Sequence, residues 1–121
     1  MRIISFAHTT PALIAGEKTV TRRNWKTDYA FQFKEGMHLQ AWNKSPRYKG
    51  IKVAEIVLTC DPFREYTKAM PDIDYKNEGF KWMLLNDVKL GNILPTYKYW
   101  FDWKRRNELL WVVRFELVKI F

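Results

Sequence analysis

The rhythm of short apolar runs constrains the fold of this chain more than any other feature. The final run, residues 109–120, places Leu109, Trp111 and Val113 on one side of an extended segment, which is the period-two pattern of a strand. Similar short runs recur along the chain, and no regular strand–helix–strand repeat separates them. We therefore predict a mostly β fold of the α+β class, an antiparallel or mixed barrel of about five or six strands with two or three short helices.

The same patterns predict where the elements lie. Strands are predicted over residues 3–6, 19–23, 37–42, 51–60 and 109–120. Helices are predicted over residues 9–16, 72–85 and 95–106, the first with a proline near its start and a glycine at its end. Gly79 weakens the second helix, so we expect an interruption there. Trp100, Phe101 and Trp111 fall on apolar faces and are expected in the core.

Composition narrows the class of protein. A length of 121 residues fits one domain, residues 1–121, and 21 Lys and Arg against 13 Asp and Glu give a net charge of +8, which favours a polyanionic partner. The single cysteine, Cys60, excludes an internal disulfide, and two histidines are too few for a zinc cluster. We therefore expect Cys60 to be a small buried residue, no metal or other cofactor, and a cytoplasmic setting. No run approaches the roughly 20 apolar residues of a membrane helix, so we expect no membrane partner. The oligomeric state stays open.

Residues 16–25 concentrate the polar side chains best suited to chemistry, because they hold a lysine, two threonines and two arginines. In an extended strand, Thr19, Thr21 and Arg23 share one face, and Arg22 lies on the other. Thr21 and Arg23 are therefore predicted to line a cleft.

Lys18, Thr21 and Glu78 form the candidate catalytic set. A lysine partly withdrawn from water can take a proton from a threonine hydroxyl, while a carboxylate holds or relays that proton. Such a set could attack an amide carbonyl. The alternative is that Lys18 and Thr21 are surface residues of an edge strand, and that Glu78 only favours the start of a helix.

Basic and aromatic residues occur in the same loops, a combination typical of proteins that bind unpaired nucleic acid. The candidate phosphate contacts are Arg22, Arg23, Arg47 and Lys49, and the candidate stacking platforms are Trp25, Trp42 and Tyr48. The alternative is a solvated basic surface with tryptophans that fill the mouth of the barrel. Residues 104–106, a Lys-Arg-Arg run, are in the same way either a solvated helix end or a phosphate contact.

Several of these segments together resemble the ASCH domain family. The run Ala15–Trp25 is similar to the family's Gly-x-Lys-Thr-x-Thr-x-Arg segment, and Glu78-Gly79-Phe80 resembles its later Glu-Gly-aromatic element. The strand 37–42, the Pro46-Arg47 loop and the apolar strand 51–58 extend the resemblance over almost the whole chain. It implies a PUA-like β-barrel, with a cleft beside the first helix and the lysine strand, in a family regarded mainly as RNA-binding. Thr19 belongs to the same motif and is included among the expected ligand contacts.

The resemblance also implies possible reactions. Some small bacterial members remove the acetyl group from N4-acetylcytidine with a lysine, a threonine and a glutamate, which would here be Lys18, Thr21 and Glu78. Other members have been associated with RNA cleavage. Arg22 departs from those compact enzymes, which tend to have an apolar residue at that position.

Two main hypotheses follow from the sequence. The first is an RNA, nucleotide or nucleoside-binding domain with a basic cleft around residues 18–23. The second is an amidohydrolase acting on a modified cytidine, or a ribonuclease, that uses the same cleft. A purely structural or protein-binding role is a third class.

Overall fold

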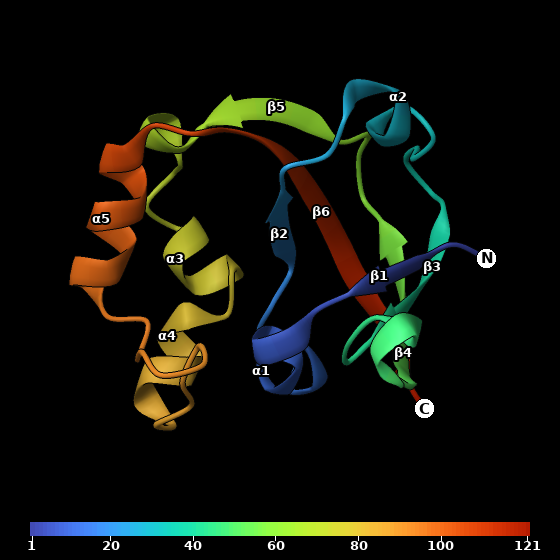
Figure 1. Cartoon of the computed structure of the whole chain (residues 1–121), viewed down its shortest axis with the longest axis horizontal. Helices are drawn as coiled ribbons and strands as arrows, with labels where there is room; N and C mark the ends of the chain where they lie inside the picture. Colours follow the sequence, from blue (N-terminus) through green and yellow to red (C-terminus); the bar gives the residue numbers. More distant parts are fainter.

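The computed structural model describes all residues 1–121 and contains a mixed six-stranded sheet that forms a half-barrel (Figure 1). The strands are β1 (Ile3–Ser5), β2 (Val20–Arg23), β3 (His38–Trp42), β4 (Lys52–Leu58), β5 (Phe63–Tyr66) and β6 (Leu109–Ile120). They lie in the order β1-β3-β4-β6-β2, and β5 pairs with β6 off this path. β1 and β3 are parallel, and every other pair is antiparallel. The long β6 therefore joins three other strands.

Short helices fill the connections. They are α1 (Thr10–Ile14), α2 (Thr27–Ala30), α3 (Asp74–Asn77), α4 (Phe80–Leu85) and α5 (Tyr97–Arg106), with single 3-10 turns η1 (Ala7–Thr9), η2 (Pro46–Tyr48) and η3 (Thr67–Ala69). Residues 67–106, which we call the helical segment, contain η3, α3, α4 and α5. Figure 1 shows α3, α4 and α5 gathered on one side of β2 and β6, with β1, β3 and β4 on the other side.

Gly79 separates α3 from α4. Its φ of 89° lies in the left-handed region that glycine adopts without steric cost. A Cβ at this position would lie 2.6 Å from the Ala12 Cβ, so α1 and the helical segment approach one another too closely for any larger residue. The interruption predicted inside residues 72–85 is confirmed at this glycine.

The predicted α+β class with a mixed barrel-like sheet is confirmed. Each of the five predicted strand ranges contains a strand, and each of the three predicted helical ranges contains at least one helix. The structure has five α-helices rather than two or three, and the pattern missed α2 and β5. Both missed elements have four residues, and their sequences are too short and too polar to show a period. Pairing with β6 makes residues 63–66 a strand.

Two separate apolar cores support the fold. The sheet core includes Phe6, Leu13, Leu39, Ile56 and Phe115. The core of the helical segment is built from the buried residues Ala12, Met70, Tyr75, Phe80, Met83 and Trp100. Phe6 of the first core and Phe80 of the second both line the pocket described below.

Two of the three aromatic residues expected in the core are buried there. Trp100 and Trp111 are buried as predicted, but Phe101 is 52% exposed. One residue advances a helix by about 100°, so α5 cannot turn both Trp100 and Phe101 inward. The expectation for Cys60 is also wrong, because this residue lies in the turn after β4 and is only half-buried.

Candidate active-site pocket

A pocket of about 360 Å³ lies between the end of β1, the strand β2 and the helical segment. Polar side chains from the β2 region line one part of it, and aromatic side chains of α4 and α5 line another. Its lining residues are Ser5, Phe6, Ala7, Thr9, Lys18, Thr21, Arg22, Arg23, Glu78, Phe80, Leu90, Tyr99 and Trp103. The pocket thus brings Lys18, Thr21 and Glu78 of the candidate catalytic set to one cavity.

Lys18 is buried and makes a direct ion pair with Glu78. Its Nζ donates to Glu78 Oε1 at 2.8 Å and to the Glu78 carbonyl oxygen at 3.0 Å. The Thr19 amide donates to the Asn77 carbonyl oxygen at 2.7 Å, which holds the start of β2 against the end of α3. The backbone bond between the neighbouring residues Thr19 and Asn77 thus helps to bring Lys18 and Glu78, 60 positions apart in sequence, into hydrogen-bond contact.

The protonation of Lys18 reflects two opposing influences. Burial lowers its pKa, and the charge and hydrogen bond of Glu78 oppose that effect without cancelling it. The pKa of Lys18 therefore lies below the ordinary lysine value of 10.5. A lysine of this kind reaches its neutral form more easily than an exposed one, which is the form that can accept a proton.

Thr21 and Arg23 line the pocket as predicted, but Arg22, which the alternation placed on the other face, lines it as well. Arg23 Nε donates to Thr21 Oγ1 at 3.2 Å, and its Nη2 donates to the Ser5 carbonyl oxygen at 2.7 Å. Both acceptors are uncharged, and Arg23 makes no salt bridge with a carboxylate. Burial lowers the pKa of Arg23, although Glu78 partly offsets this. The pocket therefore contains a guanidinium whose charge lies over the Phe6 ring and has no carboxylate partner.

Thr21 does not contact Lys18 directly. Its hydroxyl is buried and accepts the Arg23 bond, but no hydrogen bond joins it to the Lys18 amine. A water molecule or a ligand atom in the pocket would have to link the two side chains.

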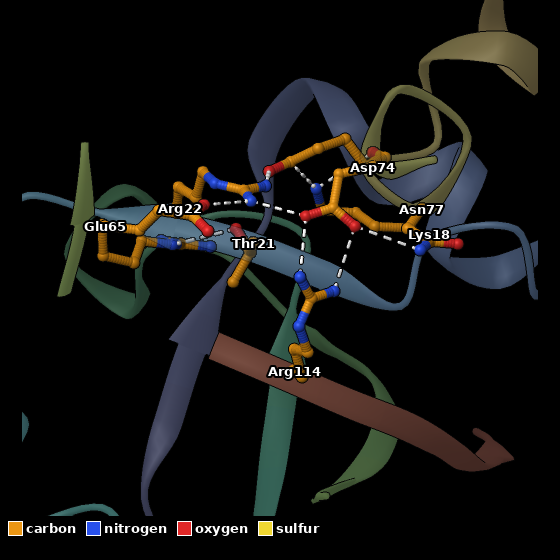
Figure 2. Close-up of polar contacts among 9 residues, drawn as sticks. Lys18, Thr21, Arg22, Glu65, Asp74, Asn77 and Arg114 are labelled. Carbon is orange, nitrogen blue, oxygen red and sulfur yellow. Dashed lines mark hydrogen bonds and ion pairs between the residues drawn. The ribbon is translucent and has the colours of Figure 1, made fainter. Parts of the chain in front are cut away.

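Arg22 has a different environment from the one predicted. Its side chain is only 1% exposed and pairs with three carboxylates: Glu78 at 2.8 Å, Glu65 at 2.9 Å and Asp74 at 2.5 Å (Figure 2). Burial by itself would lower the pKa of Arg22, but these carboxylates outweigh it and raise the pKa above the ordinary arginine value. The prediction of a phosphate contact at Arg22 fits this geometry poorly, because both Nη atoms are already used by buried acids.

The other predicted ligand residues lie outside the pocket. Thr19 is exposed, Trp25 stacks on Phe33 with ring centroids 4.5 Å apart, and the Trp42 indole donates to Gln40. Arg47, Tyr48 and Lys49 are exposed in and beside η2, and we call these three residues the basic loop. The structure thus separates the predicted site into a buried pocket and an exposed loop.

The aromatic lining of the pocket was not predicted. Tyr99 and Trp103 are four residues apart on α5, so they lie on one face of that helix and turn toward the cavity with Phe80. Their spacing was visible in the sequence, but side chains on the inward face of a helix have the same spacing whether they pack in a core or line a cavity.

A second and larger hollow, of about 600 Å³, lies beside α5 and is lined by Lys68, Phe101, Lys104, Arg105 and Asn107. It contains no carboxylate and no buried lysine, so it lacks the acid–base pair of the first pocket.

Comparisons with known proteins identify a similar fold but do not assign the chain to a family. No family model matches the chain, and no curated protein matches it. The chain is similar to the crystal structure of protein EF3133 from Enterococcus faecalis V583, described under the family model DUF984, with a TM-score of 0.56 and 16% sequence identity. The match covers 88% of this chain and 64% of that one, so this chain spans less than two thirds of its length. At this identity the similarity shows the shared half-barrel fold alone.

Two further observations concern membranes and metals. None of the helices has the length and apolar character needed to cross a lipid bilayer. No group of three or more His, Cys, Asp or Glu side chains is arranged to hold a metal ion.

Proposed function

We propose that this chain is a PUA-like domain of the ASCH type that binds a nucleoside or nucleotide in the pocket beside Lys18. The observation that carries the proposal is the composition of the lining, which sets hydrogen-bonding and charged groups close to several aromatic rings. A flat heterocycle with polar edges is the ligand that uses both kinds of group, since its faces stack on rings and its edges accept or donate hydrogen bonds.

The charge of the pocket supports an electron-rich ligand. Glu78 is paired with both Lys18 and Arg22, whereas Arg23 donates only to neutral oxygens. A carbonyl oxygen or a phosphate oxygen of the ligand can accept from Arg23 and would offset its charge in a partly dry site. The net charge of +8 would further favour an anionic ligand at long range.

The buried Lys18–Glu78 pair favours a second candidate function, hydrolysis of an exocyclic amide such as that of N4-acetylcytidine. In this reaction neutral Lys18 accepts a proton from a water in the pocket, which either is itself the nucleophile or takes the Thr21 proton in turn, and the resulting oxygen attacks the amide carbonyl carbon. Arg23 stabilises the negative oxygen that forms. Protonated Lys18 gives the proton to the Glu78 carboxylate to which it is hydrogen-bonded, and Glu78 passes it to the departing amine as the C–N bond breaks, so Lys18 returns to its neutral form. When Thr21 is the nucleophile, water then cleaves the acyl-threonine ester. The products are a carboxylate and the free amine.

Calorimetric titration with cytidine and N4-acetylcytidine, combined with an assay for released acetate, tests both functions. We expect saturable binding of at least one nucleoside to the wild type and its loss in Lys18→Ala. The matched control is Lys26→Ala, which removes an exposed lysine at the start of α2 and should leave binding unchanged. Acetate release that disappears in Lys18→Ala would establish the hydrolase. Binding that survives Lys18→Ala, or no binding of any nucleoside or nucleotide, would overturn the proposal.

A further inference from the structure

Arg22 joins three carboxylates that come from separate parts of the fold. Glu65 lies on β5, Asp74 lies on α3, and Glu78 follows α3. Only one of the three, Glu78, also contacts Lys18. Arg22 is therefore the link between the Lys18–Glu78 pair and the acidic residues behind it.

Asp74 is the most enclosed member of this group, with a side chain that is 0% exposed. It accepts two hydrogen bonds from Arg114, at 3.0 and 2.8 Å, in addition to those from Arg22 and Asn77. Figure 2 shows the two guanidiniums approaching the Asp74 carboxylate from different sides. Burial by itself would raise the pKa of Asp74, but the hydrogen bonds from Arg114 and Arg22 outweigh it and lower the pKa. Asp74 is therefore a fixed negative charge at neutral pH.

The two oxygens of Glu78 are divided between two cations. Arg22 Nη1 donates to Oε2 at 2.8 Å, and Lys18 Nζ donates to Oε1 at 2.8 Å. Because Asp74 and Glu65 hold the other nitrogen, Arg22 Nη2, the guanidinium has little freedom to rotate. The Glu78 carboxylate is consequently held in one orientation, with one oxygen on Lys18.

We propose that Asp74 is a positioning residue of the pocket: it fixes Arg22, and Arg22 in turn holds the Glu78 carboxylate against the Lys18 amine. This inference rests on the proposed function, because the orientation of Glu78 matters only if Lys18 and Glu78 face a ligand. The competing explanation is that Asp74 serves only to attach the helical segment to the sheet through Arg114. The two explanations differ in what happens at Lys18.

The charged and titratable groups that surround Lys18, directly or through a shared partner, come from several elements. Glu78 at the end of α3 and Arg22 and Arg23 on β2 act on Lys18 directly. Glu65 on β5 and Asp74 on α3 act through Arg22, Arg114 on β6 acts through Asp74, and Tyr99 on α5 faces Glu78. Removing the negative charge of Asp74 makes this surrounding more positive and loosens Glu78, and both effects disfavour the charged form of Lys18. Opening of the pocket to water would do the opposite, because it relieves the burial that lowers the Lys18 pKa.

The test is a pH titration of the Lys18 side-chain carbon next to the amine, followed by NMR in protein with ¹³C-labelled lysine. The variant is Asp74→Asn, and the matched control is Asp72→Asn, which changes an aspartate that is 92% exposed and paired only with Lys104 at 3.3 Å. We expect the midpoint of Lys18 to move to lower pH in Asp74→Asn and to stay unchanged in Asp72→Asn. Where the wild type releases acetate, turnover in Asp74→Asn should fall roughly 10- to 100-fold, because small displacements of reacting groups cost this much. An unchanged midpoint, or one that rises toward the ordinary lysine value, would overturn the inference.

A second variant keeps the test available if Asp74→Asn does not fold. Glu65→Gln removes the negative charge of another partner of Arg22, and the Glu65 side chain is 17% exposed, so the substitution disturbs the interior less. It should move the Lys18 midpoint in the same direction by a smaller amount, and no movement would count against the network. The titration needs no ligand, so its result is separate from that of the nucleoside experiments. A shifted midpoint without nucleoside binding would contradict the proposed function and leave the network intact.

Discussion

The pocket beside Lys18 and the basic loop of Arg47, Tyr48 and Lys49 both contain cations and aromatic rings, but they hold them in opposite ways. In the pocket, Lys18 and Arg22 are buried and paired with carboxylates at 2.5 to 2.9 Å. In the basic loop, the side chains are exposed and none of the three makes a salt bridge. Burial fixes the positions of charges and makes each expensive to leave unpaired, whereas exposed charges act weakly and are screened by salt.

This difference suggests a division of roles. A site that selects one ligand needs groups held in fixed positions, as in the pocket. A surface that only attracts a polyanion needs charge and little geometry, as in the basic loop. Substitutions in the pocket should therefore have large and specific effects, and those in the loop small and general ones.

The largest effect is expected for Asp74→Ala. The substitution leaves Arg114 without its carboxylate and removes one of the acids around the buried Arg22, so we predict a loss of about 3–5 kcal/mol in the free energy of unfolding. Urea denaturation followed by circular dichroism measures this loss. Asp72→Ala, which removes an exposed carboxylate, should change the stability by less than about 1 kcal/mol. Equal effects of the two substitutions would contradict the distinction between buried and exposed charges.

Acid should remove part of the same stabilisation. The pKa of Asp74 is lowered in the folded protein, so the unfolded chain binds the proton more readily and the contribution of Asp74 is present above the unfolded value of 3.8. It is lost as the pH falls from 3.8 through the lower folded value. Between pH 5 and pH 2, the free energy of unfolding should therefore fall less steeply with decreasing pH in Asp74→Asn than in the wild type. Urea denaturation at a series of pH values measures this slope. Identical slopes would show that Asp74 does not titrate with this shift.

An intermediate effect is expected at the aromatic lining of the pocket. Trp103→Ala removes a ring that faces the cavity, and loss of one stacking contact costs about 1–3 kcal/mol in nucleoside affinity. Trp42→Ala is the control, because this half-buried indole lies outside the pocket and donates only to Gln40. Calorimetric titration compares the two variants. If Trp42→Ala weakens nucleoside binding and Trp103→Ala does not, the ligand binds elsewhere.

The smallest effect is expected in the basic loop. An RNA too long for the pocket would extend onto this surface. Arg47→Ala should then weaken RNA binding equally for all sequences, and the slope of log affinity against log salt should fall by about one, the contribution of one phosphate contact. Fluorescence anisotropy with a labelled oligonucleotide over a range of salt concentrations measures both. The affinity for a single nucleoside should not change. A loss of nucleoside affinity in Arg47→Ala would contradict the separation of the two regions.

The sequence predicted the sheet better than it predicted the pocket. Alternation along residues 109–120 and the proline and glycine around residues 11–16 are local signals, and the strand and helix they indicate are present. The contact between Lys18 and Glu78 was proposed from the chemistry of the two side chains and supported by the resemblance, but no local pattern predicted it, because the residues are 60 positions apart. The same reason explains why Asp74 and Arg114 were missed, since an ion pair between a helix and a distant strand depends on the tertiary fold.

Tyr99 and Trp103 were missed for a different reason. Their spacing identified one face of α5, but apolar rings on a helix face are typical of a core, and Trp100 on the same helix is indeed in the core. Conversely, Trp25 and Trp42 were given a stacking role because they stand near arginines in sequence. The structure places them against Phe33 and Gln40 instead. Nearness in sequence to the arginines of β2 therefore did not place these two rings in the pocket, which combines residues among the first 23 with the helical segment.

The most direct test follows every lysine at once. A nucleoside titrated into protein carrying ¹³C-labelled lysine should shift the Lys18 signal saturably, because the ligand enters the pocket that contains this amine. The signal of Lys49 in the basic loop should stay where it is. A saturable shift at Lys49 with Lys18 unmoved would contradict the account, since it would place the ligand on the exposed surface and leave the buried pair without a ligand.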